Sequence, residues 1–217
     1  MTDFADLVDG YQRFRTSDWR RQHDRWEKLK VGQEPRVMVI ACSDSRVEPA
    51  QIFDTLPGEM FVVRNVANLV PPFETGGGYH GVSAAVEFAV TQLKVTEIVV
   101  LGHGQCGGCK AALAGTFTDA ERGKGGFISD WVHLLDGAKA KVSSDHADLT
   151  STEAREAMEQ AAVQTSIDNL RTFPFVREAE EADQLEIRGA VFSIDDGILR
   201  VMNETGKFEP AQPRAAA

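Results

Sequence analysis

The sequence has only three cysteines among its 217 residues: Cys42, Cys106 and Cys109. Three thiols cannot all pair and are too few for a disulfide framework, so we expect reduced thiols in a reducing compartment. The chain has no apolar run near the ~20 residues that a membrane span needs. Its first residues show no basic segment followed by an apolar core, as a secretory signal would. These absences predict a cytoplasmic protein.

Basic residues are also scarce, with 23 Lys and Arg against 33 Asp and Glu and a formal net charge of -10 at pH 7. Nucleic acids and anionic membrane surfaces are bound through basic patches, which this balance disfavours. We therefore expect neither nucleic acid nor a membrane as a partner. The content of 42% hydrophobic and 26% charged residues is typical of an ordinary globular chain.

Apolar strand patterns alternate with helical patterns along the chain. Residues 37–41 and 98–101 are typical of strands buried on both faces, and residues 60–63 open another strand between them. Residues 81–93 carry a helical stripe, and Thr150 with Glu153 forms a capping-box signature for a long helix that ends before Pro174. Residues 185–202 read as strand, tight turn and strand. We predict an α/β fold with a parallel central sheet flanked by helices and a C-terminal antiparallel strand.

Two aromatic-rich helical patterns, at residues 4–14 and 19–29, precede the first strand. We predict that these N-terminal helices pack on a second subunit, in a homodimer or a dimer-of-dimers tetramer. Packing on the chain's own domain is the alternative. Residues 1–208 are expected to form a single domain, and the Pro- and Ala-rich residues 209–217 a disordered tail.

Reactive side chains follow two of the predicted strands. Cys42 and Asp44 come after the first strand, and His103 and Cys106 come after the third. Open parallel sheets bind ligands at the carboxyl ends of their strands, so both loops would open into one crevice if these strands are neighbours. Two thiolates and an imidazole suit zinc. The fourth position would belong to Asp44 or to water, and water there is the catalytic arrangement.

Arg46 lies two residues after Asp44, where its guanidinium can hold the carboxylate in a bidentate pair. We predict that Arg46 competes with zinc for Asp44. With the pair formed, zinc carries water; with the pair broken, Asp44 takes the place of water and the site is closed. An ionised Asp44 only accepts hydrogen bonds, so it would aim a lone pair of zinc-bound hydroxide at the substrate.

Two nearby residues have plainer interpretations. Cys109 lies one helical turn after Cys106 and is expected to be a packed thiol, not a ligand. His80 follows a glycine-rich segment and could shuttle protons near neutral pH, but a local hydrogen bond is the favoured interpretation.

The segments Cys42-Ser43-Asp44-Ser45-Arg46 and 103–108 (His-Gly-Gln-Cys-Gly-Gly) resemble the two signatures of the β-class carbonic anhydrases. The resemblance continues through residues 57–68; it is strong over residues 32–108 and weak elsewhere. It implies zinc held by Cys42, His103 and Cys106, together with the Asp44–Arg46 pair. The activity that it implies is reversible hydration of CO2 to bicarbonate and a proton by zinc-bound hydroxide.

The resemblance also implies a substrate pocket. Gln33 would donate a hydrogen bond to the substrate, and Phe61, Val66 and Phe88 would line an apolar pocket, in part across a dimer interface. We place Gly104 in the same substrate-binding group. An apolar pocket suits CO2 because that molecule has no charge to bind.

Some members of this family close the site with the Asp on zinc and bind bicarbonate in a regulatory pocket. Those members have Trp and Gly at the places held here by Val39 and Ala41. We therefore predict the open-site kind, without the regulatory pocket and with Asp44 paired to Arg46 at rest. Two alternatives remain: a carbon disulfide or carbonyl sulfide hydrolase on the same zinc site, and a non-catalytic zinc or redox module.

Overall fold

The computed structural model describes residues 2–76 and 78–213, and the chain divides into two compact units, residues 1–34 and 35–217. The first unit holds helices α1 (Phe4–Thr16), α2 (Asp18–Arg21) and α3 (His23–Leu29). The second predicted helix is thus interrupted at Gln22, whose backbone (φ -101°, ψ 23°) leaves the helical region. The apolar side chains of α1 that form its stripe are all exposed: Phe4, Leu7, Val8, Tyr11 and Phe14.

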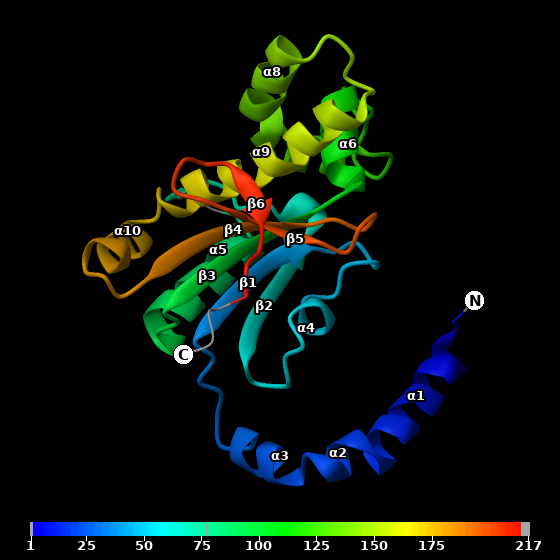
Figure 1. Cartoon of the computed structure of the whole chain (residues 1–217), viewed down its shortest axis with the longest axis vertical. Coiled ribbons are helices and arrows are strands. Elements are labelled where there is room, and N and C mark those ends of the chain that lie inside the picture. Colours follow the sequence, from blue (N-terminus) through cyan, green and yellow to red (C-terminus); the bar gives the residue numbers. More distant parts are fainter. Residues whose placement is uncertain (1, 77, 214–217) are drawn as a thin grey trace. The chain divides into compact units, whose positions relative to one another are not determined.

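The second unit is built on a mixed sheet, whose described strands have the order β2-β1-β3-β4-β5-β6 (Figure 1). The strands are β1 (Val37–Cys42), β2 (Met60–Asn65), β3 (Glu97–His103), β4 (Glu186–Phe192), β5 (Leu199–Met202) and β6 (Phe208–Pro210). The first four pair in parallel, and β5 and β6 are antiparallel. This confirms the predicted α/β fold and its C-terminal antiparallel hairpin.

Strand β6 corrects the predicted start of the tail. Glu209 and Pro210 are aligned with Val201 and Arg200 of β5, so they are not part of a disordered segment. The Pro- and Ala-rich composition was misleading here because a proline is tolerated on an edge strand, where its missing N–H faces no partner. Residues 214–217 of that prediction lie outside the described residues.

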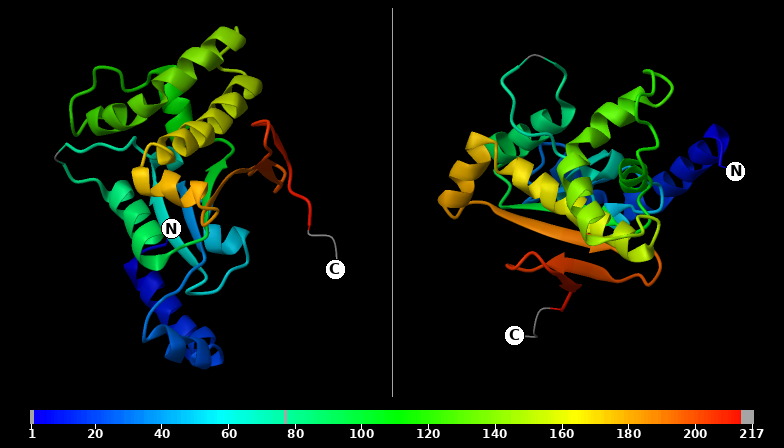
Figure 2. Two further views of the ribbon diagram at one scale, coloured as in Figure 1. Left: turned by 90° about the vertical axis from the view of Figure 1, so that its left-hand side faces the viewer. Right: turned by 90° about the horizontal axis from the view of Figure 1, so that it is seen from above.

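One face of the sheet carries the largest apolar core. It is covered by α5 (Gly81–Glu87), the π-helical segment η2 (Phe88–Leu93), α9 (Thr152–Leu170) and α10 (Pro174–Glu181). Figure 2 shows α9 and α10 lying over this face. The helix predicted over 81–93 is confirmed, with a change to π geometry in its second half. The opposite face carries a smaller cluster that includes Val39, Ala41 and Ile52, the last in α4 (Pro49–Ile52).

A separate helical layer covers the carboxyl ends of β1 and β3. It consists of α6 (Gly107–Ala114), α7 (Gly126–Val132), η3 (His133–Leu135), α8 (Asp136–Asp145) and the first half of α9. The apolar side chains of this layer form one cluster with Cys42, Cys106 and the 3-10 turn η1 (Val66–Asn68). Helix α9 is capped by Ser151, which accepts the Ala154 N–H; Thr150 of the predicted capping box bonds to Asp148 instead. Among the described residues, no helix is long and apolar enough to cross a membrane.

Helix α9 approaches the sheet closely at two glycines. A Cβ atom on Gly102 of β3 would lie 2.7 Å from Cγ2 of Val163, and one on Gly189 of β4 would lie 2.9 Å from Cγ1 of the same side chain. Both distances are below van der Waals contact, so any larger residue would push α9 away from the sheet. These glycines therefore set the height of α9 above the strand that ends at His103.

Candidate metal centre

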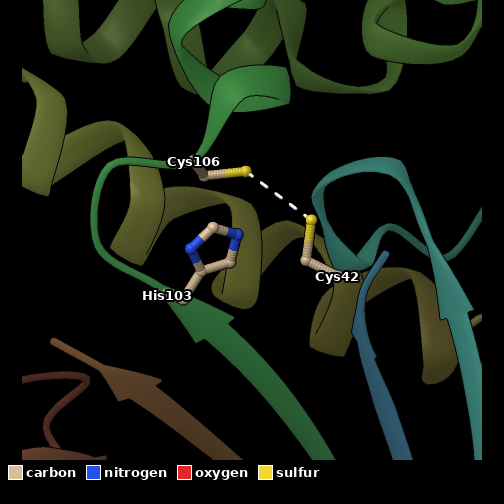
Figure 3. Close-up of side chains that lie close together, drawn as sticks. All are labelled: Cys42, His103 and Cys106. Atoms are coloured by element: carbon tan, nitrogen blue, oxygen red, sulfur yellow. Dashed lines mark hydrogen bonds between the residues drawn. The ribbon is translucent and has the colours of Figure 1, made fainter. Parts of the chain in front are cut away.

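Three potential metal ligands meet at the carboxyl ends of two neighbouring parallel strands. Cys42 is the last residue of β1, His103 is the last residue of β3, and Cys106 is the N-cap of α6. Their ligand atoms all lie within 4.8 Å of one another, and all three residues are buried (Figure 3). Because β1 pairs directly with β3, the two loops open side by side, as their positions after the strands predict.

The imidazole of His103 is prepared to bind a metal. Its Nδ1 lies 2.8 Å from the carbonyl oxygen of Gly104, a contact in which Nδ1–H donates. This leaves Nε2 as the unprotonated nitrogen, and Nε2 is buried without a hydrogen-bond partner among the described residues. A buried nitrogen left unpaired is costly, and a metal ion would satisfy it.

The two thiols also fit zinc. Sγ of Cys42 lies 3.9 Å from Sγ of Cys106, and two sulfurs bound to one tetrahedral zinc at ~2.3 Å would lie about 3.8 Å apart. The hydrogen bond with Cys106 and then burial raise the pKa of Cys42 to about 12. The hydrogen bond with Cys109 contributes most to raising the pKa of Cys106 to about 12. The thiols are thus neutral without a cation, and a metal must displace their protons to bind.

Asp44 and Arg46 form the predicted bidentate pair at the edge of this cluster. Arg46 Nε donates to Asp44 Oδ1 at 2.9 Å, and Nη2 donates to Oδ2 at 2.7 Å. The Arg46 side chain holds the pKa of Asp44 well below its usual range. Oδ2 of Asp44 lies 3.9 Å from Nε2 of His103, so an ionised carboxylate stands next to the three ligands.

Arg64 holds the loop that carries Cys42 and Asp44, a structural role that the sequence did not predict. Its guanidinium donates to the backbone oxygens of Cys42 (2.9 Å), Asp44 (2.8 Å) and Val47 (3.0 Å). A fourth bond goes to the carboxylate of Glu48. These contacts fix the backbone from which Cys42 and Asp44 project.

Glu159 of α9 is a second residue that the sequence interpretation missed. Its side chain is buried, and Oε1 accepts the backbone N–H of Cys106 at 3.0 Å. Burial raises the pKa of Glu159, and the hydrogen bond from Cys106 acts in the opposite direction. A signal was present in the sequence, because Glu159 shares the buried helix face with Ala162 and Ser166, three and seven residues further on.

The residues expected to bind substrate come from several different elements of the chain. Phe61 and Phe88 pack on each other with ring centroids 5.9 Å apart. Phe61 lies four positions before Asn65, the residue of β2 that aligns with Cys42. Val66 and Phe88 are 41% and 44% exposed, so each offers apolar surface. Gln33 belongs to the first unit of the chain.

Gly104, also expected at the substrate, has both backbone polar groups occupied. Its N–H donates to Phe192 O at 2.9 Å, and its carbonyl accepts Nδ1–H of His103.

Cys109 is buried and outside the ligand cluster, in agreement with a packed thiol. His80 Nε2 is buried and makes no hydrogen bond to the described residues, so that nitrogen lacks the local bond that was favoured.

Comparison with known proteins gives concordant results. The family model for carbonic anhydrase matches residues 37–199. "Beta carbonic anhydrase 3" of Arabidopsis thaliana is 36% identical over 205 residues, which are 94% of this chain and 79% of that protein. The structure of the beta-carbonic anhydrase CcaA superposes with a TM-score of 0.86 and 29% identity, covering 96% of this chain and 92% of the other.

A second structural match is to a protein described as tetrameric. The chain matches a structure from work on two tetrameric beta-carbonic anhydrases of Sordaria macrospora with a TM-score of 0.80 and 29% identity. The match covers 92% of this chain and 96% of that one.

Proposed function

Since the chain belongs to the β-class of the carbonic anhydrase family, and so is a zinc enzyme that reversibly hydrates CO2 to bicarbonate and a proton, we propose that its working state is the open one. In this state Asp44 is paired with Arg46 and does not bind the metal. The observation that carries the proposal is the bidentate pair, formed beside the three ligands.

Cys42, His103 and Cys106 would hold the zinc ion, which when bound lowers the pKa of water at its open position and supplies a nucleophile near neutral pH. Asp44 then acts as the orienting group. Because Arg46 keeps the carboxyl ionised, Asp44 can only accept a hydrogen bond. It would accept a hydrogen bond from the attacking group and so aim a lone pair of that group at the carbon of CO2. Arg46 occupies both carboxylate oxygens, which keeps Asp44 off the metal.

We assign Gln33, Phe61, Val66, Phe88 and Gly104 to substrate binding. The packed rings of Phe61 and Phe88 and the exposed side chain of Val66 support an apolar surface that a second subunit completes. Such a surface suits an uncharged substrate, and the amide of Gln33 could then donate to one of its oxygens.

We also propose that no bicarbonate regulatory pocket operates in this chain. Arg64, a cation that could bind bicarbonate, already donates four hydrogen bonds to the loop behind Cys42. Val39 and Ala41 are fully enclosed in the apolar cluster on the second face of the sheet. Neither feature leaves a polar opening for an anion.

The function is tested by stopped-flow CO2 hydration across a range of pH, on protein whose zinc content is measured. We expect about one zinc per chain and a rate that rises with pH as the nucleophile ionises. Zinc-loaded protein that is inactive at every pH would support the non-catalytic alternative. Faster turnover of carbonyl sulfide or carbon disulfide than of CO2 would support the hydrolase alternative.

The assembly is proposed to be a homodimer or a dimer-of-dimers tetramer, with the N-terminal helices packing on a second subunit. Residues 1–208, together with the rest of β6, are proposed to act as one domain. The exposed apolar stripe of α1 supports the proposed packing on a second subunit, because soluble monomeric proteins rarely expose a contiguous apolar patch, and such patches mark interaction sites. The described cysteines are free, which supports a reducing compartment such as the cytoplasm.

A double substitution on this stripe, Leu7→Glu with Tyr11→Glu, is expected to shift the protein toward smaller assemblies. Leu7 and Tyr11 are 61% and 53% exposed and lie one turn apart on the same face of α1, so two carboxylates there would have to be desolvated in any interface. Sedimentation velocity measures the outcome. Gln12→Glu adds charge to the same helix outside the stripe and should leave the mass unchanged, whereas an unchanged mass in the double variant would contradict the proposed interface.

A further inference from the structure

Glu159 is a buried carboxylate that the reaction described above does not use. It is 5% exposed, in the middle of α9, and it makes no ion pair with any Lys or Arg in the described part of the chain. A carboxylate removed from water without a cation is expensive for a fold to keep. Its hydrogen bond goes to the backbone N–H of Cys106, one of the three metal ligands.

The peptide group between Gln105 and Cys106 is held at both ends. Its N–H donates to Oε1 of Glu159 at 3.0 Å, and its carbonyl oxygen accepts from Nη2 of Arg46 at 3.0 Å. Glu159 comes from the helix that covers the sheet, whereas Arg46 comes from the loop after β1. Two partners from different elements thus fix the orientation of one peptide plane.

This peptide needs such support because of the residue that precedes it. Gln105 has φ +57°, in the left-handed region that residues other than glycine seldom adopt. Conformations of this kind persist where the surroundings over-determine them. The Gln105 side chain donates to Asp195 in the β4–β5 turn, which adds a third contact. Relaxation of Gln105 would rotate the following peptide and move Sγ of Cys106 away from Cys42.

We propose that Glu159 is a positioning residue of the zinc site, which holds the Gln105–Cys106 peptide so that the Cys106 thiolate and the Arg46 contact are both in place. The proposal rests on zinc binding by Cys42, His103 and Cys106. Glu159 acts through Cys106 on the metal and through the shared peptide on Arg46. It is a hydrogen-bond acceptor, so its reach and geometry matter more than its charge.

The same helix offers a matched control. Ser166, two turns after Glu159 and equally buried, accepts the N–H of Val70 at 3.2 Å and donates to Asn68 O at 3.0 Å. It therefore also joins α9 to a backbone segment of the sheet unit, but to one that carries no metal ligand. Loss of Ser166 should weaken the fold without changing the geometry of Cys106.

The experiment measures the zinc dissociation constant by competition with a chromogenic chelator, for the full chain and its variants, and the urea midpoint of each metal-free protein. Glu159→Ala is expected to bind zinc about tenfold to a hundredfold more weakly, the usual effect of removing a group that orients a ligand. Glu159→Gln retains an oxygen at the same reach and should stay within about threefold of wild type. Ser166→Ala should lower the urea midpoint and leave zinc affinity within about threefold.

Zinc affinity within threefold of wild type for Glu159→Ala would overturn the proposal, as would equal losses for Glu159→Ala and Ser166→Ala. If Glu159→Ala does not fold, Glu159→Asp replaces it, because its carboxylate is one methylene too short to reach the Cys106 N–H. The Asp variant is then expected to bind more weakly than the Gln variant, and the reverse order would overturn the account. Wild-type protein that binds no zinc would contradict the proposed function instead.

Discussion

Replacing Cys106 by alanine is expected to leave the enzyme without zinc and to lower kcat/KM for CO2 hydration roughly a thousandfold or more. Cys106 supplies one of three ligand atoms in a site with one coordination position left for the reaction. Removal of its thiolate leaves one sulfur and one imidazole, which cannot retain the ion against dilution. Metal analysis after gel filtration and stopped-flow hydration assays measure the two effects.

Cys109→Ala is the matched control for this substitution. Cys109 is the same residue type, is equally buried and lies one turn along α6, but it belongs to the apolar cluster of the helical layer and not to the ligand cluster. We expect its variant to retain about one zinc per chain. A Cys106→Ala protein with full zinc and wild-type turnover would show that the ion is held elsewhere.

Replacing Arg46 by alanine is expected to lower kcat/KM roughly a hundredfold or more while zinc stays bound. The substitution removes both side-chain hydrogen bonds that occupy the Asp44 carboxylate. Asp44 is then free to enter the coordination position meant for water, and its pKa returns toward the ordinary value. Because Arg46 lowers this pKa, loss of Arg46 lets protonation of Asp44 begin at higher pH, so the defect should deepen as pH falls.

Two further variants test the explanation. Arg46→Lys keeps the charge but loses the planar fork, so we expect activity between that of wild type and of Arg46→Ala. Arg122→Ala breaks an exposed pair with Asp130 far along the chain and should leave the rate unchanged. Activity of Arg46→Ala within threefold of wild type at all pH values would contradict the role assigned to the pair.

The parts of the site that could be predicted are those in which residue type and position suffice. A short β-branched apolar run such as 37–41 or 98–101 favours a central strand, and a ligand just after such a strand lies at the crevice. Neither run identifies the neighbour of β1, so the meeting of the two ligand pairs was predicted only on the condition that β1 and β3 are adjacent, which the structure confirms. The Asp44–Arg46 pair follows from a local spacing, which needs no tertiary information.

The parts that could not be predicted depend on contacts between distant elements or on backbone geometry. The helix position of Glu159, on one face with Ala162 and Ser166, indicates that it is buried, but its partner is a backbone N–H that no side-chain pattern identifies. The π segment at 88–93 keeps a helical stripe while its hydrogen-bond register changes. Strand β6 is too short for a periodic pattern, and it exists only because β5 offers a free edge.

The position of the ligands at the ends of two different strands has a consequence for folding. Cys42 and Cys106 are 64 residues apart in the chain, so an ion bound to both closes a long loop. A cross-link around a loop of that length would remove about 4 kcal/mol of conformational freedom from the unfolded chain in the polymer model used for disulfides. Bound zinc would then stabilise the folded chain and, with it, the pairing of β1 with β3. A chain synthesised in zinc-poor medium would therefore be expected to fold to a less stable state.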